Sequence, residues 1–275
     1  MPTPLLSWVF MFVSIRSCVL AACLLPGLAA AQADDPAIDP EAVRIVREAA
    51  EFLSTQDRLA ADWYVSWDYV IDGREKITYT RSGYNLLARG EGFYSYTDDG
   101  VKRRELFFDG GHFEIYSLDD DAYVSTPLIG TFEDLVDRAQ AEYGLALPLW
   151  EVFTKYAPGE FLEGIEAAAY LGETRIAGIP AYHLAFAQAD YDWQLWIAAD
   201  PDEPLLLSMV GTDPYTQGWP QYRAYFHNWD FAPVVTEGMF RFVPGEETAR
   251  MTWPKVEVEP GLLSQIPPGA GGGDE

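Results

Sequence analysis

Apolar and polar side chains alternate along much of this sequence, in short segments separated by glycine and aspartate. The segment 107–127, FFDGGHFEIYSLDDDAYVSTP, alternates three times and is interrupted at DGG and at LDDD. Side chains that alternate with a period of two point to opposite faces of a β-strand, and Gly and Asp adopt the backbone angles of tight turns. This segment therefore predicts consecutive β-hairpins, and the turn motifs at 72–73, 89–92 and 98–100 extend them into an antiparallel meander.

The segment before this meander, DWYVSWDYVI at 62–71, predicts a strand with one apolar face. That face carries the large side chains Trp63, Val65, Trp67, Tyr69 and Ile71. The second half of the chain predicts four more strands within 167–211, with breaks at GE, AGIP, QAD and DPDEP. A fifth strand is expected at 221–231, where aromatic and polar residues again alternate.

Two segments instead have the spacing of an amphipathic helix. Residues 40–55 place apolar side chains three and four positions apart, directly after Asp39, a good N-cap residue. The second helix is expected to begin with Thr131 and Asp134, an acidic variant of the capping box, and to end at Gly144. Short helices or turns follow it, and their aromatic side chains need a surface to cover.

The order of helix, strands, helices and strands predicts an α+β fold in a single half-barrel domain, residues 34–260. We expect one strongly curved antiparallel sheet with the helices packed on its concave side. Trp193 and Trp196 are three positions apart, so one face of a strand cannot hold both. Some rings are therefore expected to meet a helix and others to line a cavity. The Pro- and Gly-rich end, residues 261–275, is expected to be a disordered tail.

The first 33 residues have the parts of a secretory signal peptide, namely Arg16, the apolar run 17–30 and the small-residue site AAQA that ends at Ala33. A retained membrane anchor is the alternative, but Arg16 and Pro26 interrupt the run, and a spanning helix needs about 20 apolar residues. LAAC, which ends at Cys23, matches a lipoprotein signal, yet the residues after it are still apolar. We expect export to the periplasm, cleavage after Ala33 and no transmembrane segment in the mature chain.

The charge of the chain restricts its partners. The sequence has 18 Lys and Arg against 43 Asp and Glu, a net charge of −25 at pH 7. Such a chain repels the phosphate backbone, so we expect no nucleic acid partner. We interpret the basic cluster KRR at 102–104 as a solvated strand edge.

No motif of a common catalytic site is present: the sequence lacks GxSxG, HExxH, GxxxxGK[ST] and GxGxxG. Both cysteines precede residue 34, so the mature chain has no thiol for a disulfide, a metal or a nucleophile. His112, His183 and His227 lack a histidine four positions away, and no metal site is predicted. Acidic runs such as Asp119–Asp121 fall in turns, where Asp is common for backbone reasons.

The sequence resembles a family of predicted periplasmic proteins, domain of unknown function 2092, in IDPEAVRIVREAAEFL, LFFDGGHFEIYSLDDDAYVSTP, TFEDLVDRAQAEYGLALPL and GIPAYHLAFAQADYDWQLWI. More distantly, the FDG hairpin and the GIPAYHL and WQLWI pair are similar to outer-membrane lipoprotein carriers. The resemblance implies an unclosed β-barrel of about eleven strands, with helices as a lid over a hollow for acyl chains. It implies no catalytic residue, and we find no match for the arginine that helps those carriers close their lid.

We hypothesise a non-enzymatic periplasmic carrier or sensor that binds an apolar ligand, a lipid or a lipoprotein acyl chain, without a cofactor. The candidate wall residues are Trp67, Tyr69, Trp193, Trp196 and Trp229. The alternative is an envelope module that docks on another protein through a sheet edge or its acidic surface. A second alternative is a hydrolase that uses a pair of acidic residues, which in glycosidases lie about 5 to 9.5 Å apart.

Overall fold

The computed structural model describes residues 37–252, except 144, 146–148, 156–158 and 160. The predicted signal peptide at 1–33 and the predicted tail at 261–275 lie outside the described residues. The elements within them are α1 (Pro40–Thr55), β1 (Arg58–Ile71), β2 (Glu75–Ala88), β3 (Gly92–Asp98), β4 (Arg103–Phe108), β5 (His112–Ser117), β6 (Ala122–Pro127), α2 (Phe132–Tyr143), the 3-10 turn η1 (Glu151–Phe153), β7 (Ile165–Ile176), β8 (Ile179–Gln188), β9 (Asp192–Ala198), β10 (Leu206–Thr212), β11 (Gln221–Asp230) and β12 (Ala249–Arg250).

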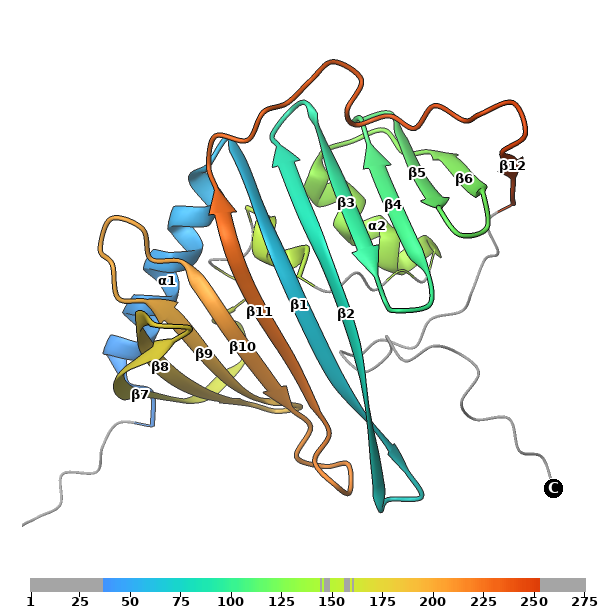
Figure 1. Ribbon diagram of the computed structural model, residues 1–275. Coiled ribbons are helices and arrows are strands. Elements are labelled where there is room, and N and C mark those ends of the chain that lie inside the picture. Colours follow the sequence, from blue (N-terminus) through green and yellow to red (C-terminus); the bar gives the residue numbers. More distant parts are fainter. Residues whose placement is uncertain (1–36, 144, 146–148, 156–158, 160, 253–275) are drawn as a thin grey trace, which may run out of the picture. The chain divides into compact units, whose positions relative to one another are not determined.

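The strands form one curved, unclosed sheet in the order β12-β6-β5-β4-β3-β2-β1-β11-β10-β9-β8-β7 (Figure 1). All pairs are antiparallel except β12 with β6, which is parallel. The expectation of about eleven antiparallel strands is thus confirmed in architecture. The twelfth is a two-residue strand at the end of the described chain, and its pairing depends on a contact between residues far apart in sequence.

The predicted turn chemistry explains why the strands fold back as hairpins. Between β1 and β2, Asp72 and Gly73 have φ angles of 51° and 63°, and the N–H of Arg74 donates to the carbonyl of Ile71 at 3.0 Å. Positive φ at both central residues defines the type I′ turn that matches the twist of the flanking strands. At the β4–β5 turn, Asp109 accepts hydrogen bonds from the N–H groups that follow it.

Both helices begin at the predicted caps. The Asp39 carboxylate accepts from the N–H of Glu41 at 2.9 Å, and its other oxygen accepts from the N–H of Tyr170 in β7 at 3.2 Å. This cap therefore also attaches the start of α1 to the sheet. At α2, Thr131 and Asp134 form a reciprocal pair, in which Thr131 N–H donates to the carboxylate at 2.7 Å and Asp134 N–H donates to the hydroxyl at 3.2 Å.

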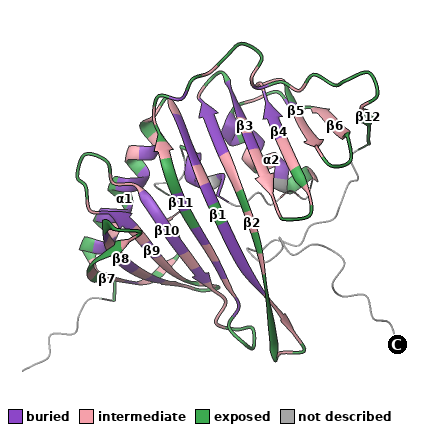
Figure 2. Ribbon diagram, viewed as in Figure 1, coloured by how far each residue is buried: buried purple, intermediate pink, exposed green. Residues whose placement is uncertain are grey.

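One face of the sheet, called here the inner face, packs against both helices. Alternate residues of β1, including Trp63, Val65 and Trp67, belong to one buried cluster together with Leu53 of α1 and Leu135 of α2. Burial follows the two-residue period along most of β11, whereas β1 is buried on both faces at 59–61 and 65–68 (Figure 2). Each such side chain contributes about 1.5–3 kcal/mol through burial. This common apolar face is therefore what holds helices and strands together.

The opposite, outer face is partly covered by the chain that follows β11. Phe240 of this segment packs on Ala60, Leu86 and Ala88, and Phe242 stacks on Tyr116 at a ring distance of 4.5 Å. Figure 1 shows the segment passing along one end of strands β1 to β5 before it reaches β12. Beyond this segment the outer face is mixed: Tyr64 and Tyr225 are exposed, whereas Asp68 and Ser208 are buried.

Among the described residues, the outer face carries one buried charge, Asp68 of β1, whose side chain is 3 % exposed. Arg223 of β11 donates to it at 3.1 Å, Thr78 of β2 at 2.9 Å and the N–H of Gln221 at 3.2 Å. Burial alone raises the pKa of Asp68, but the hydrogen bonds from Arg223 and Thr78 outweigh it and hold this pKa below its ordinary value. Asp68 thus joins the three central strands.

We expect Asp68→Asn to lower the free energy of unfolding by about 2 kcal/mol at pH 7, because Arg223 loses its anionic partner. The folded-state pKa is depressed, so this stability is complete above the unfolded-state pKa of about 3.9 and is lost as the pH falls further. Urea unfolding from pH 7 to pH 3 measures it, with Asp120→Asn, at an exposed ion pair, as the near-neutral control. A deficit that persists unchanged at pH 3 would contradict this assignment.

Candidate ligand-binding site

The two helices contact different parts of the inner face. α1 packs on β7 and β9, whereas Phe132 of α2 lies 4.7 Å from Phe93 of β3, ring centre to ring centre. Between them, Trp150 contacts Phe93 at 4.8 Å and Phe153 of η1 stacks on Trp229 at 5.7 Å. The described residues therefore present β1, β2 and β11 as the central strip of the inner face, flanked by a helix on each side.

Arg89, in the turn between β2 and β3, fixes both helices to the sheet. Its side chain donates to the carbonyl of Gln56 at 2.8 Å, to the carbonyl of Phe153 at 2.9 Å and to the carboxylate of Glu133 at 3.3 Å. Gln56 follows α1, Phe153 is the last residue of η1, and Glu133 lies in the first turn of α2. Burial lowers the pKa of Arg89, while the charge of Glu133 acts in the opposite direction. The sequence pattern did not single out this residue, because its partners are distant in the chain.

A cavity of about 270 Å³ lies beside Arg89, between the β2–β3 and β4–β5 turns and the start of α2. Its lining mixes apolar, glycine and charged residues, among them Phe108, Phe132 and Glu133. A second cavity, between α1 and strands β9 and β10, measures about 20 Å³, which is room for about one water molecule. The space between α1 and these strands is therefore filled by side chains.

The predicted wall residues fall on both faces. Trp67 is 5 % exposed on the inner face, where it stacks on Tyr79 at 5.9 Å, and Tyr69 follows it on the same face, half-buried. Trp193 and Trp229 are half-buried inner residues packed on the core. Trp196 lies on the outer face, stacked on His183 at 4.4 Å. Four of the five thus share a face, and the ligand contact itself stays a prediction.

The indole N–H groups of these tryptophans differ in an informative way. Trp193 Nε1 donates to Gln188 at 2.7 Å and Trp229 Nε1 donates to the carbonyl of Leu206 at 3.1 Å. Trp63 Nε1 and Trp67 Nε1 are buried and have no hydrogen-bond partner among the described residues. An unsatisfied buried donor costs about 1–3 kcal/mol, so such groups mark unusual positions.

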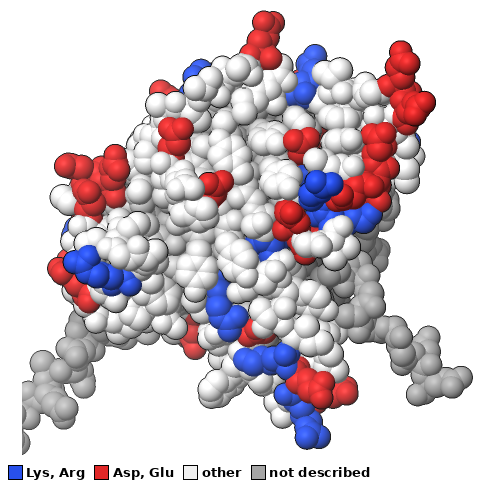
Figure 3. Space-filling model, in the orientation of Figure 1, with Lys and Arg blue, Asp and Glu red and all other residues white. Residues whose placement is uncertain are grey.

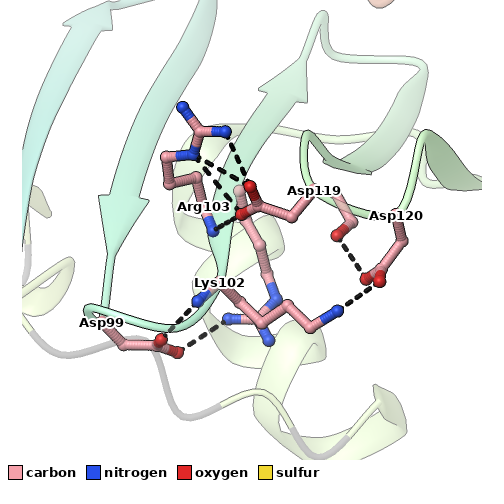
Figure 4. A network of polar contacts seen from close by, with 7 residues as sticks. Asp99, Lys102, Arg103, Asp119 and Asp120 are labelled. Carbon is pink, nitrogen blue, oxygen red and sulfur yellow. Dashed lines mark hydrogen bonds and ion pairs between the residues drawn. The ribbon is translucent and has the colours of Figure 1, made fainter.

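The basic cluster at 102–104 is neutralised by the aspartates of the neighbouring turns (Figure 4). Lys102 pairs with Asp120, Arg103 with Asp119 at 2.6 Å, and Arg104 with Asp99 at 3.2 Å. Arg103 is half exposed, but β4 lies between β3 and β5, so the cluster is at the start of an interior strand and not on an edge of the sheet. These pairs leave no concentrated positive surface there for an anionic polymer.

Asp119 and Asp120 also have the wrong acidity for a general acid. Hydrogen bonds from Arg103 lower the pKa of Asp119, and the contact with Lys102 lowers the pKa of Asp120. An acidic pair in a glycosidase needs one carboxyl with a raised pKa. Among the described residues, no group of three or more His, Cys, Asp and Glu has the arrangement of a metal site, and no helix there has the length and apolarity to span a membrane.

The comparisons with known proteins identify a family. The model of the family described as "Predicted periplasmic protein (DUF2092)" matches residues 42–252. No curated protein matches the sequence.

Several solved structures are distantly similar. The lipoprotein LppX from Mycobacterium tuberculosis is 13% identical with a TM-score of 0.42, over 72% of this chain and 98% of that one. LprF from Mycobacterium bovis is 12% identical with a TM-score of 0.41, over 72% and 96%. A LolA superfamily protein from Nitrosomonas europaea is 12% identical with a TM-score of 0.34, over 73% and 97%. At these values we transfer neither ligand nor activity from them.

We expect Arg89→Gln to lower the free energy of unfolding by about 2–3 kcal/mol, because buried carbonyl groups of two segments lose their donor. Hydrogen–deuterium exchange should then speed up at the last turn of α1 and at η1 more than in β1. Arg58→Gln is the matched control, since Arg58 forms an exposed ion pair with Glu91 of the same turn. Equal exchange in the two variants would show that Arg89 does not hold the helices.

Proposed function

We propose that this chain, which belongs to the family of predicted periplasmic proteins (DUF2092), binds an apolar ligand such as an acyl chain on the inner face of its sheet. The protein would then act as a periplasmic carrier or sensor. In this proposal the inner face is the concave side of the curved sheet, and the two helices cover it as a lid. The fold is that of an unclosed half-barrel.

One observation supports the proposal: the inner face has apolar and aromatic side chains that are only half-buried. Large side chains pack on the core yet stay half-buried along this face, namely Tyr79, Ile115, Tyr170, Tyr182, Trp193 and Trp229. These side chains leave apolar area in water on this face, which an apolar ligand would cover. Concave apolar surfaces with few polar groups are what acyl ligands require.

The attachment of the helices fits a cover that can move. Apart from apolar packing, the described contacts of α1 with the rest of the chain concentrate at its two ends, at Asp39 and at the Arg89 contacts. Between these ends, α1 packs on the core through buried apolar side chains such as Ile45, Val46 and Ala49. Displacement of a helix would therefore need few polar contacts to break, and apolar ligand would replace the lost packing.

A matched pair of variants tests the wall. Trp193 and Trp196 lie on the same strand but on opposite faces. We expect Trp193→Ala to weaken binding of a fluorescent C12 fatty acid by about tenfold, the effect of losing one aromatic contact of about 1.5 kcal/mol. Trp196→Ala should leave the dissociation constant unchanged. Native mass spectrometry of protein isolated from a bacterial periplasm should also show a lipid adduct.

Two results would refute the proposal. One is a dissociation constant that both substitutions change equally, because the inner face would then have no special role. The other is the failure of the wild-type protein to bind any acyl probe, together with an adduct-free mass in repeated preparations.

A specific feature favours protein docking as a second function. The outer face exposes Tyr64 and Tyr225, 39% and 40% accessible, on neighbouring paired strands. Figure 3 shows uncharged surface between scattered acidic and basic side chains on this face, with the acidic groups most concentrated toward the margins of the view. A partner with an apolar centre and a basic rim would suit this surface. Cross-linking in a periplasmic extract compares the wild-type chain with the double variant Tyr64→Ser plus Tyr225→Ser. A partner that only the wild-type chain captures separates this function from ligand binding.

A further inference from the structure

Four buried N–H donors without a hydrogen-bond partner occur together on the inner face of β1 and β2. They are Trp63 Nε1, Trp67 Nε1, Asn85 Nδ2 and Arg81 Nε. The side chains of Trp63, Trp67 and Asn85 are at least nine-tenths buried. We call these four residues the donor cluster. No acceptor is left over in this cluster, because the Asn85 carbonyl oxygen accepts from Ser95 at 2.8 Å.

The pairing of the strands makes the cluster contiguous. Trp63 is paired with Gly83, and the residues two positions to either side of Gly83 are Arg81 and Asn85 on the same face. A Cβ atom on Gly83 would lie 2.3 Å from Trp63 Cζ2 and 2.7 Å from Cε2, so the indole occupies the place of a side chain at 83. Its Nε1, bonded to Cε2, therefore lies close to position 83, whose same-face neighbours along β2 are Arg81 and Asn85.

Trp67 completes the cluster on the side of Arg81. The guanidinium carbon of Arg81 lies 5.5 Å from the centre of the Trp67 ring. This contact holds the cation over an aromatic face, as in other cation–π pairs. It leaves the guanidinium N–H groups free to bind an acceptor in the plane of the group.

The charge of Arg81 has no carboxylate partner among the described residues. Burial lowers the pKa of Arg81; among the described groups, Asp99 and Tyr222 raise this pKa and Arg104 lowers it. Asp99 is itself bound to Arg104 at 3.2 Å. In a chain with 43 acidic residues, a half-buried arginine without an ion pair is unusual, because a buried charge is costly unless it is paired.

Resting on the proposed function, we infer that the bound ligand is an anionic amphiphile, whose carboxylate or phosphate accepts hydrogen bonds from the donor cluster. Arg81 supplies the charge, and Trp63, Trp67 and Asn85 supply neutral donors. Planar guanidinium groups bind both kinds of anion with two parallel hydrogen bonds. A purely hydrocarbon ligand would leave all four donors unsatisfied, and a cationic ligand would face a cation.

The burial gradient of β2 orients such a ligand. The residues from Glu75 to Thr80 are mostly exposed, Arg81 is half-buried, and Asn85 to Ala88 are buried. The anionic group would therefore lie near the middle of β2, and the acyl chain would extend from it over the apolar part of the inner face. The hydrated end of the ligand is thus placed nearer to solvent.

Three ligands with the same chain test the inference: dodecanoate, dodecyl phosphate and dodecanol at pH 8. Displacement of the neutral probe N-phenyl-1-naphthylamine measures each dissociation constant. We expect the wild-type protein to bind at least one of the two anions about tenfold or more tightly than the alcohol, the value of a charge-assisted hydrogen bond. A preference between dodecanoate and dodecyl phosphate identifies which anion the cluster takes.

Arg81→Gln should reduce the preference for the anion to less than about threefold while dodecanol binding is kept. Arg103→Gln, at an exposed ion pair, is the matched control and should retain the full preference. Thermal unfolding shows that each variant is folded. The comparison of the three ligands on the wild-type protein does not depend on any variant. Equal wild-type affinity for the anions and the alcohol would overturn the inference and leave the proposed function intact. Failure of all three ligands to displace the probe would overturn both.

The indole N–H groups give a direct readout. In a ¹⁵N-tryptophan spectrum, dodecanoate or dodecyl phosphate should shift the Trp67 Nε1–H resonance downfield, and dodecanol should not. Trp67→Phe, which keeps an aromatic ring but removes the donor, assigns the resonance. An identical shift with anion and alcohol would show that the indole senses only the chain, and it would overturn the role of Trp67 as a donor.

Discussion

The structure depends on the burial of one face of β1. This strand pairs with β2 from Arg58 to Ile71 and with β11 from Ala60 to Trp67, so it joins the hairpins of both halves of the chain. Because side chains alternate with a period of two, a slip by one residue would turn Trp63 and Trp67 to the outer face. Gly83 fixes this arrangement, since any Cβ there would overlap the Trp63 ring. The positions of both helices depend on this register, because both helices pack on the face that carries Trp63 and Trp67.

The same central strands hold two buried or half-buried charges in opposite situations. Asp68, on the outer face, accepts hydrogen bonds from three neighbouring groups, including the guanidinium of Arg223. Arg81, on the inner face, forms no ion pair with a described residue. A charge that serves only the fold is expected to have the first environment, because desolvation is otherwise uncompensated. The second environment is expected where the missing partner belongs to a ligand.

Local patterns predicted much of the fold. The caps at Asp39 and Thr131, the type I′ turn at Asp72 and the alternation of β1 each depend on neighbouring residues, and all were readable from the sequence. Non-local contacts were not readable in this way. The parallel pairing of β12 with β6 joins residues more than 120 positions apart in the chain, and no local propensity encodes it.

The candidate site shows the same division. Alternation correctly separated Trp193 from Trp196, yet it could not say which of them faces the helices. Arg89 was missed because its acceptors lie on three segments that meet only in the folded chain. Arg81 and Asn85 had a usable signal: they lie four positions apart on the same face of β2, where apolar residues are expected. A polar residue at such a position is a recognisable departure from the pattern.

The distribution of the basic residues supports a role for Arg81 that is distinct from stability. Arg47 and Arg74 are exposed, so water solvates their charges and a partner is unnecessary. Arg103, Arg104 and Lys102 balance aspartates at the turns. Arg81 has neither full solvation nor a carboxylate, although acidic residues are abundant in the chain. An anionic group on a ligand would resolve this imbalance, and the many exposed acidic residues would discourage non-specific anion binding elsewhere. Selectivity would then come from burial of the cation, and affinity from the apolar face around it.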